Sequence, residues 1–73
     1  MMETNEIFLT RRELEIIEEV SNGLIDKEIA TKIYISTGTV KKHIQNIFKK
    51  MGVRNRVEAS MKYQFELKVN AAW

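Results

Sequence analysis

A chain of 73 residues provides one domain, and the absence of cysteine excludes disulfide bonds and thiolate metal sites. No stretch approaches the ~20 apolar residues of a membrane-spanning helix, and the N-terminus lacks the basic-then-apolar pattern of a signal peptide. The net charge of +2, taken as a total, is only a weak indication of a partner. We therefore expect a soluble, cytoplasmic protein that has no membrane contact and needs no cofactor.

Residues 1–8 are expected to form a loose leader before the first helix. Thr10 and Glu13 form a capping box, in which the Thr10 hydroxyl accepts from the Glu13 amide and the Glu13 carboxylate accepts from the Thr10 amide. Gly23 ends the helix after about Asn22. The apolar residues of this helix form one stripe, namely Leu14, Ile16, Ile17 and Val20.

Asp26 is the expected N-cap of a short second helix over 27–33. Its inward residues are Ile29, Ala30 and Ile33. The following connection through Tyr34 is very short, and Ser36 caps a third helix. Two helices joined by three or four residues cross steeply, which predicts a helix-turn-helix.

The third helix, over about 37–51, has two unlike faces at roughly 100° per residue. The expected core face is Val40, Ile44, Ile47, Phe48 and Met51. The opposite face is Lys41, Lys42, Gln45, Asn46 and Lys49. Exposed helices usually intersperse charges of both signs, so a polar face without a carboxylate is unusual.

Gly52 closes the third helix, and Asn55 with Glu58 is a weaker capping pattern for a fourth that runs to about Leu67. This helix is apolar on two sides, with Val57, Met61 and Phe65 on one and Ala59, Tyr63 and Leu67 on the other. One side must pack on the first three helices. The second is best explained by a two-fold dimer, with Val57, Met61, Gln64 and Phe65 at the interface. The domain is expected to span residues 9–68, followed by a tail over 69–73.

The charges are divided unevenly along the chain. Residues 1–35 carry four basic and eight acidic side chains, whereas residues 36–73 carry eight basic and two acidic ones. No acidic residue lies between Ser36 and Val57. This asymmetry favours one positive surface that attracts a polyanion, although charge alone also allows a solvated basic helix without a partner.

Motifs at fixed spacing run through residues 9–61: Leu9-Thr10-x-Arg12-Glu13, Gly23, Lys27-Glu28-Ile29-Ala30, Ile35-Ser36-x-x-Thr39-Val40-Lys41-x-His43, Asn46-Ile47, Lys50-Met51-Gly52-Val53-x-Asn55-Arg56 and Ala59. In these the chain resembles the LuxR/GerE-type helix-turn-helix domains of bacterial transcription regulators. The resemblance implies an all-α, four-helix domain whose third helix enters the DNA major groove and whose fourth helix pairs in a homodimer.

Most such domains follow a receiver or ligand-sensing domain. With its own Met start, this chain resembles the few stand-alone members. It departs from the family at Gly38, where a longer or polar side chain is common, and Lys42 occupies a variable position that should affect target choice.

Lys41, Lys42 and Gln45 are the candidates for base contacts, because side chains in the N-terminal half of a recognition helix reach base edges. Lysine can donate to guanine, and glutamine pairs bidentately with adenine. The alternative is a solvated polar face.

Phosphate contacts are expected from two groups of residues. Ser36, Thr37 and Thr39 lie at the start of the third helix, where free amides and the helix dipole favour an anion. Ser36 also has the simpler role of a cap. The cationic candidates are Lys27, Lys49, Lys50, Arg54 and Arg56.

Several side chains have a structural interpretation. Glu13 projects near the apolar stripe of the first helix, where a lone carboxylate would be costly to bury, and we expect either its own capping box or Arg56 to satisfy it. His43 is expected to be a packed histidine at the edge of the core face, with a phosphate contact as an additional role, and not a metal ligand. Tyr34 and Phe48 are expected to be packing residues.

An enzyme is disfavoured, because the chain has no nucleophile–base set, no phosphate-binding glycine loop and no metal cluster. The main rival is a protein-interaction module that binds RNA polymerase or another regulator. A second rival is a fragment of a larger polymerase-associated factor. A protein-binding face on the third helix would favour aromatic or Met anchors. Sequence-specific binding of double-stranded DNA is therefore the favoured interpretation, with RNA polymerase as a further partner to consider.

Overall fold

Helix α1 (Arg11–Ser21) begins at the predicted capping box. In the computed structural model, which describes residues 8–68, the Thr10 hydroxyl accepts from the Glu13 amide at 3.1 Å. The Glu13 carboxylate accepts from the Thr10 amide at 2.9 Å. Both ends of the box are therefore formed. The parts of the expected leader and tail at residues 1–7 and 69–73 lie outside the described residues.

Helix α2 (Asp26–Ile33) begins one residue earlier than predicted. Its N-cap is Ile25, whose amide donates to the Glu28 carboxylate at 2.9 Å. Asp26 is therefore the first helical residue and not the cap. The Ile25 carbonyl accepts the first helical bond, from the Ile29 amide at 3.0 Å, and the Asp26 carboxylate accepts instead from the Arg56 guanidinium at 2.7 Å.

Helix α3 (Thr37–Met51) has the predicted bounds. The Ser36 hydroxyl accepts from the Thr39 amide at 3.0 Å, which confirms the cap. At the other end Gly52 has φ of +70°, the left-handed conformation that glycine adopts without strain.

Helix α4 (Arg56–Lys62) begins at Asn55, whose side-chain oxygen accepts from the Glu58 amide at 2.9 Å. The chain then continues as a π-helical segment, η1 (Tyr63–Lys68). The predicted helical extent to about Leu67 is confirmed, but the helix widens from Tyr63 onward. There the Tyr63 hydroxyl donates to the Glu18 carboxylate on α1. Burial and this bond raise the pKa of Tyr63 to about 12.

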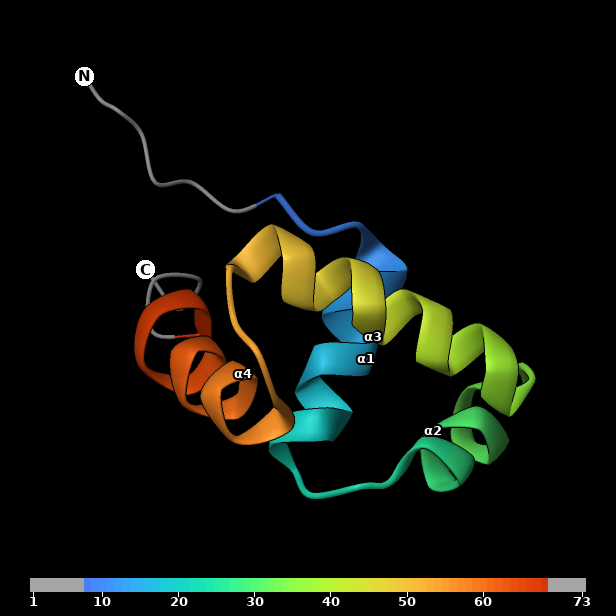
Figure 1. The fold of residues 1–73 in the computed structure, drawn as a ribbon. Coiled ribbons are helices and arrows are strands. Elements are labelled where there is room, and N and C mark those ends of the chain that lie inside the picture. Colours follow the sequence, from blue (N-terminus) through green and yellow to red (C-terminus); the bar gives the residue numbers. More distant parts are fainter. Residues whose placement is uncertain (1–7, 69–73) are drawn as a thin grey trace.

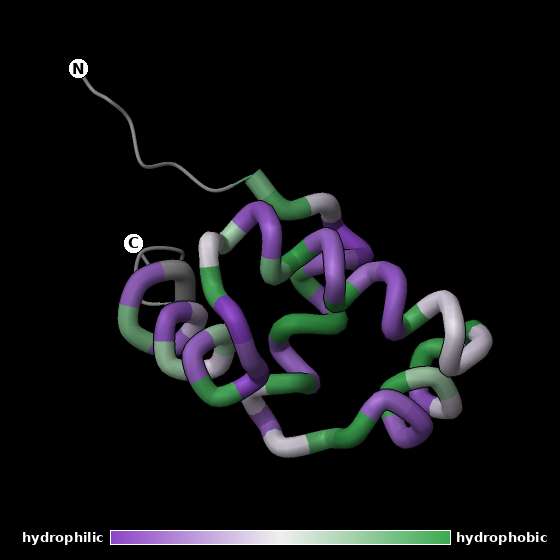
Figure 2. The backbone as a smooth tube through the Cα atoms, viewed as in Figure 1, coloured by the Kyte–Doolittle hydropathy of each residue, from purple (hydrophilic) through white to green (hydrophobic). Residues whose placement is uncertain are grey.

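Helix α1 is the centre of the arrangement, with α3 across it on one side and α4 packed on another, while α2 packs mainly against α3 (Figure 1). The hydropathy changes repeatedly along each helix, as one apolar face per helix requires (Figure 2). Every described element is helical, so the predicted all-α, four-helix class is confirmed. No helix within residues 8–68 has the length and apolar character needed to cross a membrane.

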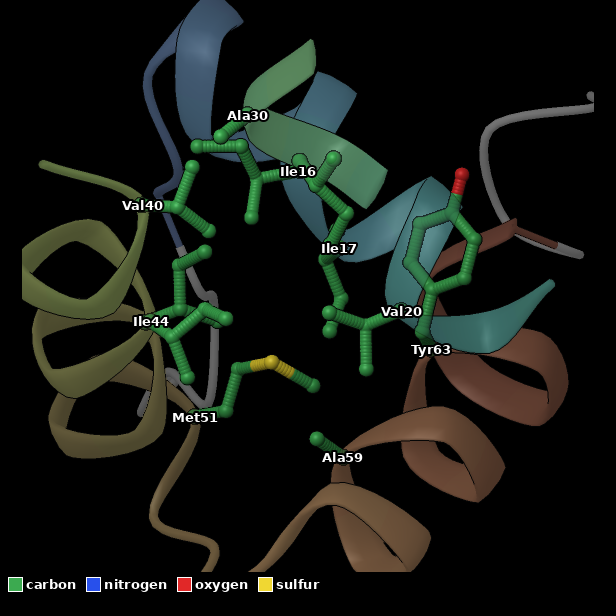
Figure 3. Close-up of a cluster of buried hydrophobic side chains, with 11 residues drawn as sticks. Ile16, Ile17, Val20, Ala30, Val40, Ile44, Met51, Ala59 and Tyr63 are labelled. Carbon is green, nitrogen blue, oxygen red and sulfur yellow. The ribbon is translucent and has the colours of Figure 1, made fainter. Parts of the chain in front are cut away.

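The core is formed by side chains from every element, which converge between α1, α3 and α4 (Figure 3). Its members are Ile16, Ile17, Val20, Ile29, Ala30, Val40, Ile44, Ile47, Met51, Ala59 and Tyr63. Phe48 and Ile33 pack against its edge. The core face predicted for the third helix is therefore confirmed.

Two residues expected in the packed interior are exposed instead. Leu14 lies outside the core because the buried face of α1 consists of positions 13, 16, 17 and 20. Glu13, and not Leu14, is therefore the buried residue at the start of this face. Tyr34 is 92% exposed and has φ of +62°, so the prediction that it packs is wrong. It ends α2 in the left-handed conformation, with its side chain in solvent.

Candidate nucleic-acid interface

The outward face of α3 brings the three predicted base-contacting residues together. Lys41, Lys42 and Gln45 are all exposed, as are Asn46 and Lys49 beside them. Because the spacings are three and four residues, these side chains lie on adjacent turns of one face. None of the lysines on this face takes part in an ion pair within residues 8–68. The face therefore presents cationic and amide groups that no carboxylate within residues 8–68 neutralises.

Two hollows flank the start of this face. One, of about 440 Å³, is lined by Ser36, Gly38, Thr39, Lys42, His43 and Asn46. The other, of about 390 Å³, is lined by Ile25, Asp26, Lys27, Thr37, Lys41 and Arg56. The second hollow places Lys27, from the start of α2, near Lys41 on α3. A cationic residue far away in sequence is thus added to the N-terminal end of the α3 face.

The hydroxyl groups at the start of α3 hold each other in place. The Ser36 and Thr39 hydroxyls share a hydrogen bond of 2.8 Å while Ser36 also caps the Thr39 amide. Thr37 is half-buried. The structural role of Ser36 as a cap is therefore present whether or not a phosphate binds here.

Glu13 is paired with Lys50, and the predicted partner Arg56 is wrong. The Lys50 Nζ donates to Glu13 Oε1 at 2.8 Å, and the Glu13 side chain is only 6% exposed. Burial alone would raise the pKa of Glu13, but the hydrogen bonds from Lys50 and Thr10 outweigh it and the pKa is lowered. The end of α3 therefore lies against the start of α1, where Lys50 reaches the Glu13 carboxylate.

Arg56 instead joins the start of α4 to the start of α2. Its guanidinium donates to the Asp26 carboxylate at 2.7 Å and to the Leu24 carbonyl at 2.9 Å. Arg54, in the connection just before α4, is paired with Glu58 on α4 at 3.2 Å. The five cationic candidates for phosphate contacts thus divide: Lys50, Arg54 and Arg56 have carboxylate partners, whereas Lys27 and Lys49 have no ion pair among the described residues.

Helix α4 and its continuation expose one apolar side. Ala59 and Tyr63 are buried against α1, while Val57, Met61 and Phe65 are 68%, 55% and 71% exposed. This confirms which of the two apolar sides packs inward. Gln64, the fourth expected interface residue, is exposed and donates to the Ser21 carbonyl at 3.4 Å.

Ile25 also belongs to this surface, although no pattern in the sequence predicted it. Ile25 is exposed and lines, with Leu24, Val57 and Met61 among others, a hollow of about 340 Å³ beside α4. Ile25 lies in the connection just before α2 and not on the apolar stripe of a helix, so helical periodicity could not identify it. The loop between α1 and α2 therefore extends the apolar surface of α4.

Known proteins are similar to this chain in both sequence and fold. Residues 8–63 match the GerE profile, described as bacterial regulatory proteins of the luxR family. Over 53 residues the chain is 51% identical to the transcriptional regulatory protein LnrK of Bacillus subtilis (strain 168), a match that covers 73% of this chain and 24% of LnrK. It is 47% identical over 53 residues to the nitrate/nitrite response regulator protein NarP of Escherichia coli (strain K12), covering 73% and 25%.

A solved structure agrees with these sequence relatives. The response regulator ChrA, from a heme-sensing two-component system, matches with a TM-score of 0.76 at 37% identity. This match covers 81% of the chain and 29% of ChrA. The chain thus spans about a quarter of the length of the curated relatives it matches.

Proposed function

Because the chain belongs to the luxR family of bacterial regulatory proteins, we propose that it binds double-stranded DNA sequence-specifically and regulates transcription. In this proposal α3 lies in the major groove and α4 forms a homodimer. The observation that carries it is the outward face of α3, where exposed lysine and amide groups lie together and no carboxylate of the described chain pairs with them. Acting on bacterial DNA, the protein would work in the cytoplasm.

Lys41, Lys42 and Gln45 are the proposed base contacts. They lie on the first half of α3, the part of a recognition helix that approaches base edges. Lysine ammonium groups can donate to guanine O6 and N7, and the glutamine amide matches adenine N6 and N7. All three side chains are exposed, so binding does not require the core to open.

The proposed phosphate contacts are of two kinds. Lys27 and Lys49 are the primary cations, because they have no ion pair among the described residues. Lys27 lies beside the start of the α3 face, and Lys49 lies on that face nearer the end of the helix. Ser36, Thr37 and Thr39 would contact a phosphate at the start of α3. Lys50, Arg54 and Arg56 would contribute less, since a phosphate must compete with the carboxylates of Glu13, Glu58 and Asp26.

A homodimer through α4 is supported by its exposed apolar residues. Val57, Met61 and Phe65 recur every four residues, so they form one ridge along α4 and η1. A two-fold axis would place this ridge against its own copy, with Gln64 at the margin. Two protomers would then present two α3 helices to successive half-sites of the DNA.

The rival interpretation is a module that binds RNA polymerase or another regulator. The α3 face does not favour protein binding, because its exposed residues are lysine, glutamine and asparagine and not the aromatic or Met anchors of protein interfaces. Contact with RNA polymerase in addition to DNA stays a prediction.

The test is selection of bound duplexes from a random-sequence pool, followed by gel shift on the selected sequence. The triple variant K41A/K42A/Q45A should keep its helix content but lose its preference for the selected duplex over a scrambled one. A matched control, R11A/R12A, also removes two charges, but from the start of α1, which lies by the C-terminal end of α3. It should keep the preference. Unchanged selectivity in the triple variant would show that α3 does not read the sequence.

A further inference from the structure

Gly38 lies on the proposed DNA-reading face of α3. It is the second residue of the helix and is exposed. Lys41, Lys42 and Gln45 follow it at spacings of three, four and seven residues, which places all four positions on one face. Gly38 therefore occupies the N-terminal end of the row that contains the proposed base contacts.

The fold itself gives no reason for a glycine at this position. The glycines with positive φ in the described chain are Gly23 and Gly52, so Gly38 has a backbone conformation open to other residues. A Cβ added to Gly38 would meet only the Ser36 hydroxyl, at 3.9 Å, which is an ordinary van der Waals distance. Glycine in a helix is less stable than alanine, because it loses more backbone freedom on folding. Alanine would thus fit and would stabilise the helix.

The space left by the missing side chain opens outward. Gly38 lines the hollow of about 440 Å³, together with Lys42, His43 and Asn46 on the next two turns. No carboxylate and no large apolar side chain lines this hollow. A duplex that contacts Lys42 would therefore pass close to the Gly38 backbone, where a side chain would hold it away.

From these observations we infer that Gly38 is a specificity-determining residue, whose missing side chain lets the edge of a base pair approach the α3 backbone in the major groove. The inference rests on the proposed function. Glycine elsewhere serves the same purpose where a ligand must approach a backbone closely. The depth at which α3 enters the groove would then depend on Gly38, and so would the reach of Lys42 to the bases.

The experiment uses the full chain and the duplex selected with the unsubstituted protein. Gly38→Ala should raise the melting temperature by about 2–4 °C, since it improves helix propensity. It should nevertheless bind the selected duplex about tenfold more weakly, the order of effect of one mismatched base pair. Gly38→Gln should weaken binding further, while binding to a scrambled duplex should change little for either variant. Thr31→Ala, at an exposed position of α2, is the matched control that should alter stability without altering binding.

The possible results separate this inference from the proposed function. If the unsubstituted chain selects a sequence and Gly38→Ala binds it equally well, the inference is wrong and the proposed function stands. If Gly38→Ala lowers the melting temperature, the fold requires the glycine and the inference is also wrong. If the unsubstituted chain selects no sequence, the proposed function fails and the inference fails with it.

Discussion

Lys50 and Glu13, 37 positions apart in the sequence, form a hydrogen-bonded ion pair of 2.8 Å that joins the end of α3 to the start of α1. Glu13 is the buried charged residue of the described chain, and it also closes the capping box with Thr10. One carboxylate therefore serves both the start of a helix and the packing of two helices. Lys50 keeps partial contact with water, which moderates the strength of the pair.

Lys50→Ala should destabilise the fold by about 1–2 kcal/mol, because it leaves a buried carboxylate with only its capping contacts. Urea unfolding would measure this change. The double variant Glu13→Gln/Lys50→Ala should lose much less free energy of unfolding than the two single variants lose in total, because neither partner of the ion pair then remains alone. Additive effects would mean that the pair contributes nothing to stability.

The same pair should make stability depend on pH. The pKa of Glu13 is lowered in the folded protein, so its contribution is fully present above the ordinary value of 4.5 and is lost as the pH falls through and below that value. Urea midpoints between pH 6 and pH 3 should therefore fall less steeply for Glu13→Gln than for the unsubstituted chain. An equal fall of the urea midpoint with pH in both proteins would show that the Glu13 carboxylate is not the stabilising group.

Tyr34→Asn should stabilise the domain by about 0.5–1 kcal/mol, because asparagine tolerates the left-handed conformation better than tyrosine does. Since the Tyr34 side chain is 92% exposed, little packing is lost. Tyr34→Ala is the control, as it removes the ring but keeps the unfavourable conformation. Thermal unfolding of the three proteins would show the effect, and equal stability of the Asn and Ala variants would contradict it.

Binding to DNA should weaken steeply with salt. If a dimer neutralises about eight phosphates, log K should fall with log salt at a slope of about −7. Lys49→Ala, present in both protomers, should make this slope less negative by about 2, whereas Arg54→Ala should change it less because Glu58 already holds that guanidinium. Fluorescence anisotropy over a salt series would measure both slopes, and equal changes would remove the distinction between free and paired cations.

Met61→Glu should disrupt the proposed dimer, because a carboxylate would have to be buried within the apolar ridge of α4. We expect DNA affinity to fall on the order of tenfold with helix content retained. Sedimentation with and without DNA, together with circular dichroism, would measure this. Thr31→Glu introduces the same charge at an exposed position of α2 and should have a smaller effect. A monomer at high concentration, with normal DNA binding by Met61→Glu, would refute the dimer.

The helix starts at Thr10, Ser36 and Asn55 could be predicted from the sequence alone, and so could the buried face of α3. Each depends on groups within one or two helical turns, where backbone geometry leaves few alternatives. The candidate base contacts followed from the same periodicity, because a face opposite the core must be exposed.

Only the tertiary structure decided which charges meet. Glu13 pairs with Lys50 and not with Arg56, and Arg56 pairs with Asp26, because helix crossings bring together residues 30 and 37 positions apart. The exposure of Tyr34 and Ile25 could not be predicted from a local sequence pattern either, since both lie in connections whose direction is set by how the helices pack. Periodicity assigns a side chain to a face of its own helix, but it carries no information about which neighbour that face will meet.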